Sequence, residues 1–508
     1  MLETINRAKK SVKVKDEMNL ACPIQGSTYP DLRKKCALKM SEINADFHPI
    51  GGVVPLMENQ RYTDLLKIII ASKKGLVPDR PAHLFGAGHP LIFPIAVALG
   101  CDFFDSSAYV KYANDKRMIF PWGTEKIDEL EESPCFCPIC SKYSISELKK
   151  LEKKKRIQKI SKHNLYVCQS EIFRIRNAIK NGSLWELVER KARYNPYLQK
   201  ALLLLRKKNN KKWMEKFEPI TKKKAVFYTG SQTIHRPIIY RSHKRLDERY
   251  NKKDFDVFYI IEKKTKPYST FYRKDLKKLF EEKNEKFDVI AKSNMGAIPI
   301  ELDEMYPFAQ SIFPEEVDVE TRNLAEKNFS EFLEDKQTKK LEINKSSEQD
   351  KKIVDIELFD QRKVAAVIDM QFGKNVSTAL LDGQVSFIKS KNTGKIRNVL
   401  LDGKHILSMR AEDGFFTLKI EGGKLIKKSF KKPFLRVTVD DEAKPFVKDG
   451  KSVFAKFVLD CDENLRPYDE CLLVDKKDNL LAVGRCLLNR EEMLSFNNGV
   501  AAKNREHI

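Results

Sequence analysis

Between Asn19 and Tyr109, short apolar blocks alternate with stretches in which apolar residues recur at helical spacing. The blocks "NLACPIQGS", "ADFHPIGGVVPL", "RPAHLFGAGHP" and "CDFFDSSAY" have the length and composition of buried strands. Between them lie "YPDLRKKCALKMSEI", "TDLLKIIIASKKGL" and "LIFPIAVALG", which are typical of helices, and residues 1–19 have the pattern of an amphipathic helix. Strands that alternate with helices through short turns predict βα units and a parallel sheet.

The predicted strands all end in small or polar residues. These ends are Gln25 to Ser27, Gly51 and Gly52, Gly86 to Gly88, and Asp105 to Ser107. In a (β/α) barrel such ends form the active-site face, although turn chemistry alone also places these residue types there. Four such ends in succession favour a site. The pattern contains about four βα units, half of an eight-stranded barrel.

The rest of the chain divides into three further predicted regions. Helical periodicity continues from Leu165 to Leu205, and a Lys-rich region then runs to about Lys352, ending in the charged stretch "NFSEFLEDKQTKKLEINKSSEQDKK", which is typical of a solvated helix end and linker. A helix and strands follow from Ile353. Short alternating strands from about Pro433 predict a small β-barrel, with Phe446 and Phe454 in its core. The predicted domains are 1–220, 221–352, 353–431 and 432–508.

The charge balance indicates a polyanionic partner. The 508 residues include 95 Lys and Arg against 71 Asp and Glu, a formal net charge of +24. Basic side chains that neutralise phosphates release counterions, which favours nucleic acid, although a Lys-rich genome gives the same bias. No apolar run reaches the ~18 residues of a membrane span, and residues 1–20 lack the apolar core of a signal peptide. We therefore expect a cytoplasmic protein without a membrane partner.

The stretch "SPCFCPICSKY" predicts a metal site. Cys135, Cys137 and Cys140 stand at C-x-C-x-x-C spacing, and His163 follows at the predicted start of a helix. Three thiolates and one imidazole complete a tetrahedron around Zn²⁺, and without a further ligand nearby we expect one closed, structural zinc per chain. Free thiols packed by chance are the alternative. The remaining cysteines have the character of small core residues, among them Cys22, Cys36 and Cys101.

Several of these segments together resemble one family. "PIQGSTYPDLRKKCA", "IGGVVPLME", "HLFGAGHPLIFPIAVALGCDFFDSSAYVKYANDKR", "PCFCPICSKY" and "HNLYVCQSEIFRIRNAI" are similar to the archaeal tRNA-guanine transglycosylases. "YPFAQS", "MQFGKN" and "AEDGFFTL" resemble the later domains of that family, and "VKDGKSVFAKFVLDCDENLRPYDECLLVDKKDNLLAVG" resembles its C-terminal, RNA-binding PUA domain. The order of the segments is preserved over nearly the whole chain.

The resemblance implies an activity and a nucleophile. The family exchanges a guanine in the D-arm of tRNA, at position 15, for 7-cyano-7-deazaguanine on the route to archaeosine. Its nucleophilic aspartate lies in the motif that matches "DFFDSS", which implies that Asp105 attacks the ribose C1′ and forms a covalent intermediate. The incoming base then displaces the aspartate from the same face, as in retaining glycoside chemistry. Capping of the next segment is the structural alternative for Asp105.

The resemblance also assigns binding residues. Gln25 matches the glutamine that reads the base edge, and Gly51 and Gly52 match glycines whose main chain contacts the base. Cys135, Cys137, Cys140 and His163 match the family's zinc ligands. In the PUA-like segment, the expected RNA contacts are the turn glycine Gly450 and the phosphate-binding candidates Lys448, Lys451 and Lys456. The implied partners are tRNA, guanine and 7-cyano-7-deazaguanine, and the family also implies a homodimer.

One departure from the family leaves alternatives open. Family members begin with a further segment that carries the first barrel strands and two more functional aspartates, and this sequence has no counterpart. A second polypeptide supplying the N-terminal half, a fragment or misassigned start, and a relative that has lost catalysis all fit. A non-catalytic tRNA-binding protein and the related archaeosine synthase are therefore the alternative functions. The expected architecture is the C-terminal part of a (β/α)8 barrel with a zinc knuckle at about residues 130–165, then α+β domains and a PUA barrel.

Overall fold

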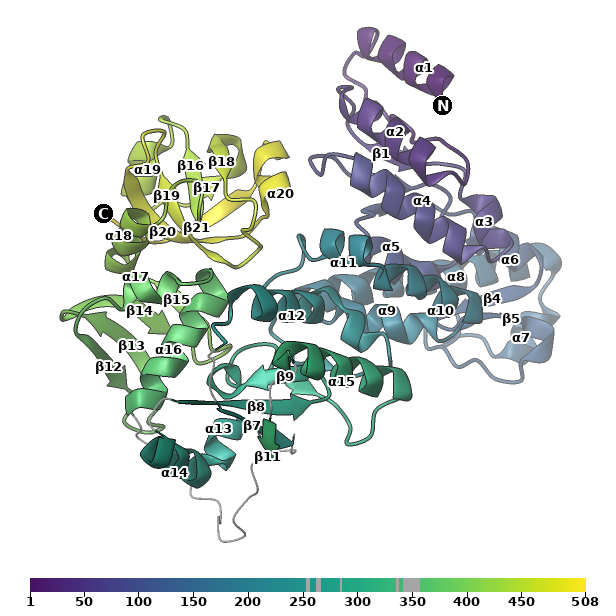
Figure 1. The fold of residues 1–508 in the computed structure, drawn as a ribbon. Coiled ribbons are helices and arrows are strands. Elements are labelled where there is room, and N and C mark those ends of the chain that lie inside the picture. The colour runs from purple at the N-terminus through teal and green to yellow at the C-terminus, as the bar shows by residue number, and fades with distance from the viewer. Residues whose placement is uncertain (253–255, 262–265, 284–285, 335–337, 341–356) are drawn as a thin grey trace. The chain divides into compact units, whose positions relative to one another are not determined.

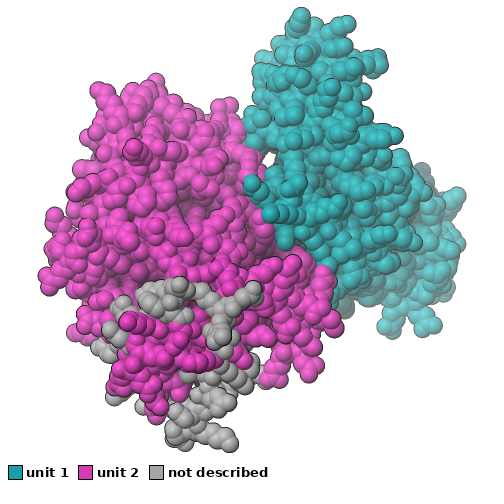
Figure 2. Space-filling model, in the orientation of Figure 1, with its two compact units in different colours: residues 1–213 teal, residues 214–508 magenta. Residues whose placement is uncertain are grey.

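A computed structural model describes residues 1–252, 256–261, 266–283, 286–334, 338–340 and 357–508. The chain divides into two compact units, Met1–Trp213 and Met214–Ile508 (Figure 2). The predicted charged linker begins inside helix α15 (Val319–Leu333), but its parts 335–337 and 341–352 lie outside the described residues. Within the described residues, no helix is long and apolar enough to cross a membrane.

The first unit contains the predicted parallel sheet. Strands β1 (His48–Ile50), β2 (Ala82–Leu84) and β3 (Phe103–Phe104) pair in parallel in that order. Residues Ala21 and Ile24 form parallel bridges with Phe47 and Ile50, so this segment lies beside β1 as a fourth row. The alternation predicted from the sequence is therefore confirmed. The helices of this part are α1 (Leu2–Lys13), α2 (Pro30–Ser41), α3 (Val54–Glu58), α4 (Tyr62–Gly75), α5 (Phe93–Ala98) and α6 (Ala108–Asn114).

Apolar packing explains why these short strands hold together. Helix α2 packs against α4 (Figure 1), and Met40, Leu65 and Leu66 are fully buried. Cys22, Cys36 and Cys101 are 0 to 2% exposed, which confirms that they are core residues. Burial of such side chains removes apolar surface from water, at about 25 cal/mol per Å².

A hairpin and a long helix complete the first unit. Strands β4 (Arg117–Phe120) and β5 (Gly123–Lys126) pair antiparallel, and α7 (Ile145–Lys150) begins with a capping box in which Ser144 and Glu147 exchange hydrogen bonds. Helix α8 (Lys153–Asn181) ends at Gly182 in the left-handed conformation. The last helices of the unit are α9 (Leu184–Ala192), α10 (Pro196–Leu202) and α11 (Lys208–Met214), whose last residue opens the second unit.

The second unit begins with a mixed sheet in the order β11-β7-β8-β9. Strands β7 and β8 pair in parallel, and β8 and β9 pair antiparallel. The strands are β7 (Asp256–Ile261), β8 (Phe287–Ser293), β9 (Gly296–Pro299) and β11 (Thr338–Lys340), with a separate parallel pair β6 (Val226–Phe227) and β10 (Ser311–Ile312). The helices are α12 (Pro237–Arg249), α13 (Tyr268–Phe271), α14 (Arg273–Lys283) and α15.

Two further sheets follow in the second unit. An antiparallel sheet contains β12 (Val385–Lys389), β13 (Ile396–Leu401), β14 (Lys404–Met409) and β15 (Phe416–Leu418), and its helices are α16 (Glu357–Phe372), α17 (Val376–Leu380) and α18 (Ile420–Ser429). The last sheet has six strands in the order β17-β21-β20-β19-β16-β18. Its elements are β16 (Arg436–Val439), α19 (Lys444–Lys448), β17 (Val453–Phe454), β18 (Val458–Cys461), β19 (Glu470–Val474), β20 (Leu480–Cys486), α20 (Arg490–Ser495) and β21 (Val500–His507).

The small β domain predicted from about Pro433 is confirmed, but the prediction of two core residues in it is wrong. The side chains of Phe446 and Phe454 are 61% and 47% exposed. Phe454 lies on β17, which is the edge strand of the sheet, between buried Val453 and Ala455. Side chains alternate faces along a strand, so the apolar character of one residue does not show which face it takes.

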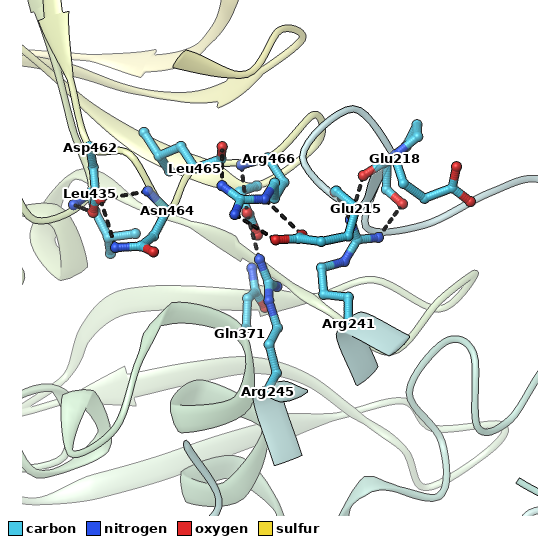
Figure 3. Close-up of polar contacts among 12 residues, drawn as sticks. Glu215, Glu218, Arg241, Arg245, Gln371, Leu435, Asp462, Asn464, Leu465 and Arg466 are labelled. Carbon is cyan, nitrogen blue, oxygen red and sulfur yellow. Dashed lines mark hydrogen bonds and ion pairs between the residues drawn. The ribbon is translucent and has the colours of Figure 1, made fainter. Parts of the chain in front are cut away.

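Buried ion pairs join the segment before α12 to the loop between β18 and β19. Arg466 donates to both carboxylate oxygens of Glu215, at 2.9 and 2.8 Å, and Arg245 donates to Asp469 at 2.7 Å (Figure 3). These four side chains are at most 8% exposed. Arg241 donates to main-chain carbonyls of the same segment, including that of Glu215 at 3.1 Å. The contacts fix the last sheet of the second unit against its first helix.

Candidate active site and metal cluster

The carboxyl ends of the four parallel rows bring the predicted site residues to one edge. Ile24 bridges to Ile50, and Leu84 pairs with Phe104, so the residues that follow these positions are neighbours. The amide of Phe85 donates to the carbonyl of Ile50 at 3.3 Å and continues this alignment beyond the strands. The segments at this edge are Gln25 to Ser27, Gly51 and Gly52, Gly86 to Gly88, and Asp105. The four strand ends therefore lie next to one another at one edge of the sheet, as the sequence predicted.

Asp105 is held through one oxygen only. Its Oδ1 accepts hydrogen bonds from the main-chain amide of Gly86 at 2.6 Å and from Nε2 of His83 at 2.8 Å. Its side chain is 49% exposed, and Oδ2 has no hydrogen-bond partner among the described residues. The alternative that Asp105 caps the next helix does not hold, because Ser107 is the residue that precedes α6. A fixed carboxylate with one free oxygen is suited to attack an electrophile.

His83 is a site residue that the sequence interpretation missed. In β2 the side chains of Ala82 and Leu84 are buried, and His83 between them takes the other face. Its ring lies 5.3 Å from that of Phe85 in an edge contact and 6.2 Å from that of Phe47. The side chain is 15% exposed. The only signal in the sequence is a polar residue at the middle of an apolar strand near its carboxyl end.

Gln25 and Gly51 lie in close contact. A Cβ atom added to Gly51 would come 2.8 Å from Nε2 of Gln25, so the amide end of Gln25 would have to move to admit a side chain there. Gly52 has φ +69°, a left-handed conformation that glycine adopts without strain. The amide end of Gln25 therefore lies over a main chain without side chains, at the same edge as Asp105. A planar ligand can approach such a surface closely.

A buried arginine, also missed, supports the Gln25 turn. Arg33 on α2 is 0% exposed and donates to the carbonyls of Ile24 at 2.7 Å and Ser27 at 2.8 Å. Its guanidinium thus holds the main chain on both sides of the turn. Burial lowers the pKa of Arg33 below its ordinary value, because the charged form loses hydration. The main-chain amide of Gln25 also donates to the Cys36 sulfur at 3.4 Å.

The four predicted metal ligands converge on one point. Ligand atoms of Cys135, Cys137, Cys140 and His163 all lie within 4.8 Å of one another. Nδ1 of His163 is 3.2 Å from the Cys140 sulfur and 3.4 Å from the Cys137 sulfur. In a tetrahedral zinc site with Zn–S distances of about 2.3 Å and Zn–N distances of about 2.0 Å, the nitrogen is separated from each sulfur by about 3.5 Å. The donor set and its spacing therefore fit a four-coordinate ion.

Contacts behind the cluster orient the imidazole. Nε2 of His163 is 2.9 Å from the carbonyl of Ile119, so it donates there and leaves Nδ1 for the ion. Hydrogen bonds with Cys135 and Cys140 hold the pKa of the Cys137 thiol below its ordinary value, which favours the thiolate that binds metal. One expectation needs correction. His163 does not start a helix, because α8 begins at Lys153.

The predicted RNA contacts lie on the surface of the last sheet domain. Lys448 ends α19, and Lys451 and Lys456 follow within the next elements, and all three side chains are exposed. Gly450 has φ +81°, and a Cβ there would come 3.2 Å from the ring of His507. The left-handed conformation therefore requires glycine at this turn. The geometry presents three cations and two exposed phenylalanine rings within a short stretch of chain.

Comparisons with known proteins connect these features. A family model described as Queuine tRNA-ribosyltransferase matches residues 1–197, the patch-forming domain C2 of tRNA-guanine transglycosylase matches residues 362–433, and the PUA domain matches residues 435–508. The tRNA-guanine(15) transglycosylases of Methanosphaera stadtmanae, Methanobrevibacter smithii and Thermococcus kodakarensis are 39%, 40% and 40% identical to the chain. Each alignment covers 99% of this chain and 78%, 79% and 75% of the respective relative.

The resemblance found in the sequence is thus confirmed at the level of the family and of its PUA domain. The comparisons lend no support to a separate N-terminal polypeptide or to a truncated enzyme, and those expectations stay predictions. The roles of the individual site residues and the homodimer also stay predictions.

Proposed function

This chain belongs to the tRNA-guanine transglycosylase family, and we propose that it exchanges guanine 15 in the D-arm of tRNA for 7-cyano-7-deazaguanine. The observation that carries the proposal is the Asp105 carboxylate, with Oδ1 held by two donors and Oδ2 free at the strand edge. Gln25 and the Gly51 main chain lie at the same edge. A binding module has no need for this combination, which favours catalysis over the alternative of a non-catalytic tRNA-binding protein.

The reaction is a double displacement at one carbon. Oδ2 of Asp105 attacks the ribose C1′, the C1′–O bond forms, and the C1′–N9 bond to guanine breaks with its electron pair going to guanine. The departing guanine anion takes a proton from water. The incoming 7-cyano-7-deazaguanine then gives its N9 proton to water and attacks C1′, and the aspartyl ester bond breaks to restore the carboxylate. Two inversions retain the configuration. The negative charge of the carboxylate stabilises the oxocarbenium-like transition states.

Gln25, Gly51 and Gly52 are the proposed base-binding residues. A side-chain amide offers a donor and an acceptor, which matches the edge of a purine. The absence of side chains at Gly51 and Gly52 leaves main-chain groups accessible to a flat base. Arg33 holds the turn that carries Gln25 and so keeps the reading group in place. Guanine and 7-cyano-7-deazaguanine share this edge, so one pocket serves both bases.

Cys135, Cys137, Cys140 and His163 are the proposed ligands of one structural zinc ion per chain. A bound Zn²⁺ supplies a cross-link and no chemistry of the base exchange, since four protein ligands close its coordination. His163 lies on α8 and the cysteines lie before α7, so the ion ties the hairpin region to the long helix. The same proposal assigns tRNA backbone contacts to Lys448, Gly450, Lys451 and Lys456 in the PUA domain.

Base exchange can be tested directly with labelled guanine. The purified chain is mixed with unmodified tRNA and labelled guanine, alone and with a polypeptide carrying the first barrel strands of a relative, and the tRNA is analysed by mass spectrometry. We expect label at position 15 with the wild type and with Asp115→Asn, an exposed surface control, and none with Asp105→Asn. Exchange only in the presence of the added polypeptide would support the predicted split enzyme.

Two results would overturn the proposal. Tight tRNA binding without exchange under either condition would leave a tRNA-binding protein on an inherited scaffold. Conversion of 7-cyano-7-deazaguanine already present in tRNA to an amidine, without guanine exchange, would instead identify an archaeosine synthase.

A further inference from the structure

We infer that His83 is a positioning residue for the proposed reaction, which directs the free oxygen of Asp105 at the ribose by holding the other oxygen. This inference rests on the proposed function of Asp105. Nε2 of His83 lies 2.8 Å from Oδ1 and the Gly86 amide lies 2.6 Å from the same atom. Because Asp105 is acceptor-only when ionised, Nε2 carries the proton of this hydrogen bond.

Two donors on one oxygen fix the carboxylate in a way that one donor cannot. The main-chain amide of Gly86 comes from the segment after β2, and the His83 side chain comes from β2 itself. A carboxylate that is 49% exposed and held by a single bond can turn about its side-chain torsions. With both donors in place, the second oxygen is the one presented to solvent and to a substrate. Misplacement of a reacting group by about 1 Å costs on the order of 100-fold in rate.

The hydrogen bonds also distinguish the two oxygens in the covalent intermediate. Oδ2 becomes the ester oxygen bound to C1′, and Oδ1 becomes the carbonyl oxygen. When the ester breaks in the second displacement, the electron pair of the C1′–O bond returns to the carboxylate. Donors already aimed at Oδ1 stabilise that returning charge without reorganisation. His83 is therefore expected to assist both displacements through Asp105, without touching the ribose.

The surroundings of His83 hold its ring in one orientation. Phe85 meets it edge-on at 5.3 Å between ring centroids, and Phe47 lies at 6.2 Å with its ring tilted by 42°. Other histidines of the same unit have a structural pattern instead: ring nitrogens of His48 and His89 contact main-chain carbonyls, at 3.2 Å to Cys22 and 3.0 Å to Gly123. Only for His83 among these three is the partner the proposed nucleophile.

The test compares His83→Ala with His83→Gln, because the glutamine amide can place an N–H near the position of Nε2. His405→Gln, in the second unit, is the matched control. Labelled guanine exchange is measured at saturating and limiting tRNA to separate kcat from KM, and thermal unfolding of each variant is recorded. We expect His83→Ala to lower kcat about 100-fold with little change in KM or unfolding temperature. His83→Gln should recover at least about tenfold of that loss, and His405→Gln should match the wild type.

Four outcomes would overturn the inference. Wild-type kcat in His83→Ala, with Asp105→Asn inactive, would remove His83 from the reaction and leave the proposed function intact. Equal losses in His83→Ala and His83→Gln, or losses confined to unfolding temperature and KM, would show a packing role only. Absence of exchange in the wild type, both alone and with the added N-terminal polypeptide, would instead reject the proposed function, and the inference with it.

Discussion

Asp105 in the first unit and Glu215 in the second are carboxylates held in opposite ways. Glu215 is buried at 2% exposure, and Arg466 occupies both of its oxygens. Asp105 is half-exposed, is held by a neutral amide and an imidazole, and keeps one oxygen free. A bidentate guanidinium neutralises a carboxylate and leaves nothing to react. An amide and an imidazole on one oxygen fix the position of the carboxylate and leave its second oxygen available.

The difference indicates that the Asp105 carboxylate is suited to a reaction and that the Glu215 carboxylate contributes to stability. Loss of the Asp105 charge should cost activity and little stability, because solvent already reaches that side chain. Loss of a partner of Glu215 should cost stability, because the remaining charge stays buried without compensation.

The largest effect is expected for Asp105→Asn. The amide keeps an oxygen for the donors of His83 and Gly86 but cannot form the ester, so guanine exchange should fall by about 10⁴-fold or more. The free energy of unfolding should stay within about 1 kcal/mol of the wild-type value. Steady-state measurement of guanine exchange checks the loss of activity, and calorimetry on the same preparation checks the unchanged stability. Residual exchange above a hundredth of the wild-type rate would show that another group is the nucleophile.

Removal of the metal should have the next largest effect. We expect one zinc per chain by elemental analysis of the purified protein, and Cys137→Ala should lose it. Binding energies of structural zinc sites are on the order of 10 kcal/mol, so chelation should unfold the hairpin and α7 region before the rest. Cys168→Ala, a cysteine on α8 outside the cluster, is the control and should keep the metal. A metal-free wild type with unchanged unfolding would contradict the site.

Arg466→Met tests the buried pair. It leaves the Glu215 charge buried without a partner, and unfolding should be easier by about 3–5 kcal/mol. The neighbouring surface pair of Lys216 and Glu491 is the comparison, since Lys216→Met should change stability by less than about 1 kcal/mol. The double variant Glu215→Met with Arg466→Met should recover part of the loss in denaturant titrations. A single variant as stable as the wild type would show that the pair contributes nothing.

The buried carboxyl group of Glu470 should reveal itself in the pH dependence of stability, although the guanidinium groups of Arg410 and Arg505 lie 3.6 and 3.9 Å from its Oε1. Burial raises the pKa of Glu470 to about 7 from an ordinary 4.5. Between pH 4.5 and 7 the folded state then holds a proton that the unfolded state has released, so the free energy of unfolding falls as pH rises. The loss amounts to about 3 kcal/mol across the window. The free energy of unfolding of Glu470→Gln should not show this fall between pH 4.5 and 7. The same dependence of stability on pH in the wild type and in Glu470→Gln would show that Glu470 is not its source.

Glu215 should behave with the opposite sign. Burial opposes its ionisation, but the hydrogen bonds and charge of Arg466 dominate and hold the pKa of Glu215 below its ordinary 4.5. Its contribution to stability is therefore present above pH 4.5 and lost as the pH falls below that value.

The smallest effect is expected at the RNA surface. Binding of tRNA should weaken steeply with salt, and Lys451→Ala should lower the slope of log affinity against log salt by about one. Lys277→Ala on α14, an exposed lysine of the second unit, is the control and should leave the slope unchanged. Filter binding at several salt concentrations provides the measurement. An unchanged slope for Lys451→Ala would remove this residue from the interface.

Local patterns in the sequence predicted a large part of the candidate site. The spacing of Cys135, Cys137 and Cys140 is itself the geometry of a metal knuckle, so the cluster needed no tertiary information beyond His163. The strand ends could be found because parallel strands bring their carboxyl ends together whatever the register. Both features depend on distances along the chain that are set by backbone geometry.

The residues that escaped prediction act through partners distant in the sequence. His83 contacts a carboxylate 22 positions later, and Arg466 pairs with a residue 251 positions earlier. No periodicity relates such positions, since the contact exists only after the elements pack. The burial of Arg33 follows from the turn that folds over it, and its position in the helix does not by itself predict this contact. The prediction that Phe454 lies in the core was wrong for a different reason. Phe454 is on an edge strand, which has one exposed face.

The central claim is that Asp105 forms a covalent bond with tRNA. The direct measurement is to incubate the wild-type chain with tRNA, without free base and with any partner that exchange requires, digest the protein and the RNA, and locate the nucleotide-modified peptide by mass spectrometry. We predict one adduct, on the peptide that contains Asp105, that is absent in Asp105→Asn and that disappears when guanine is added. An adduct on any other residue, or exchange that proceeds with no adduct at any time point, would contradict the account.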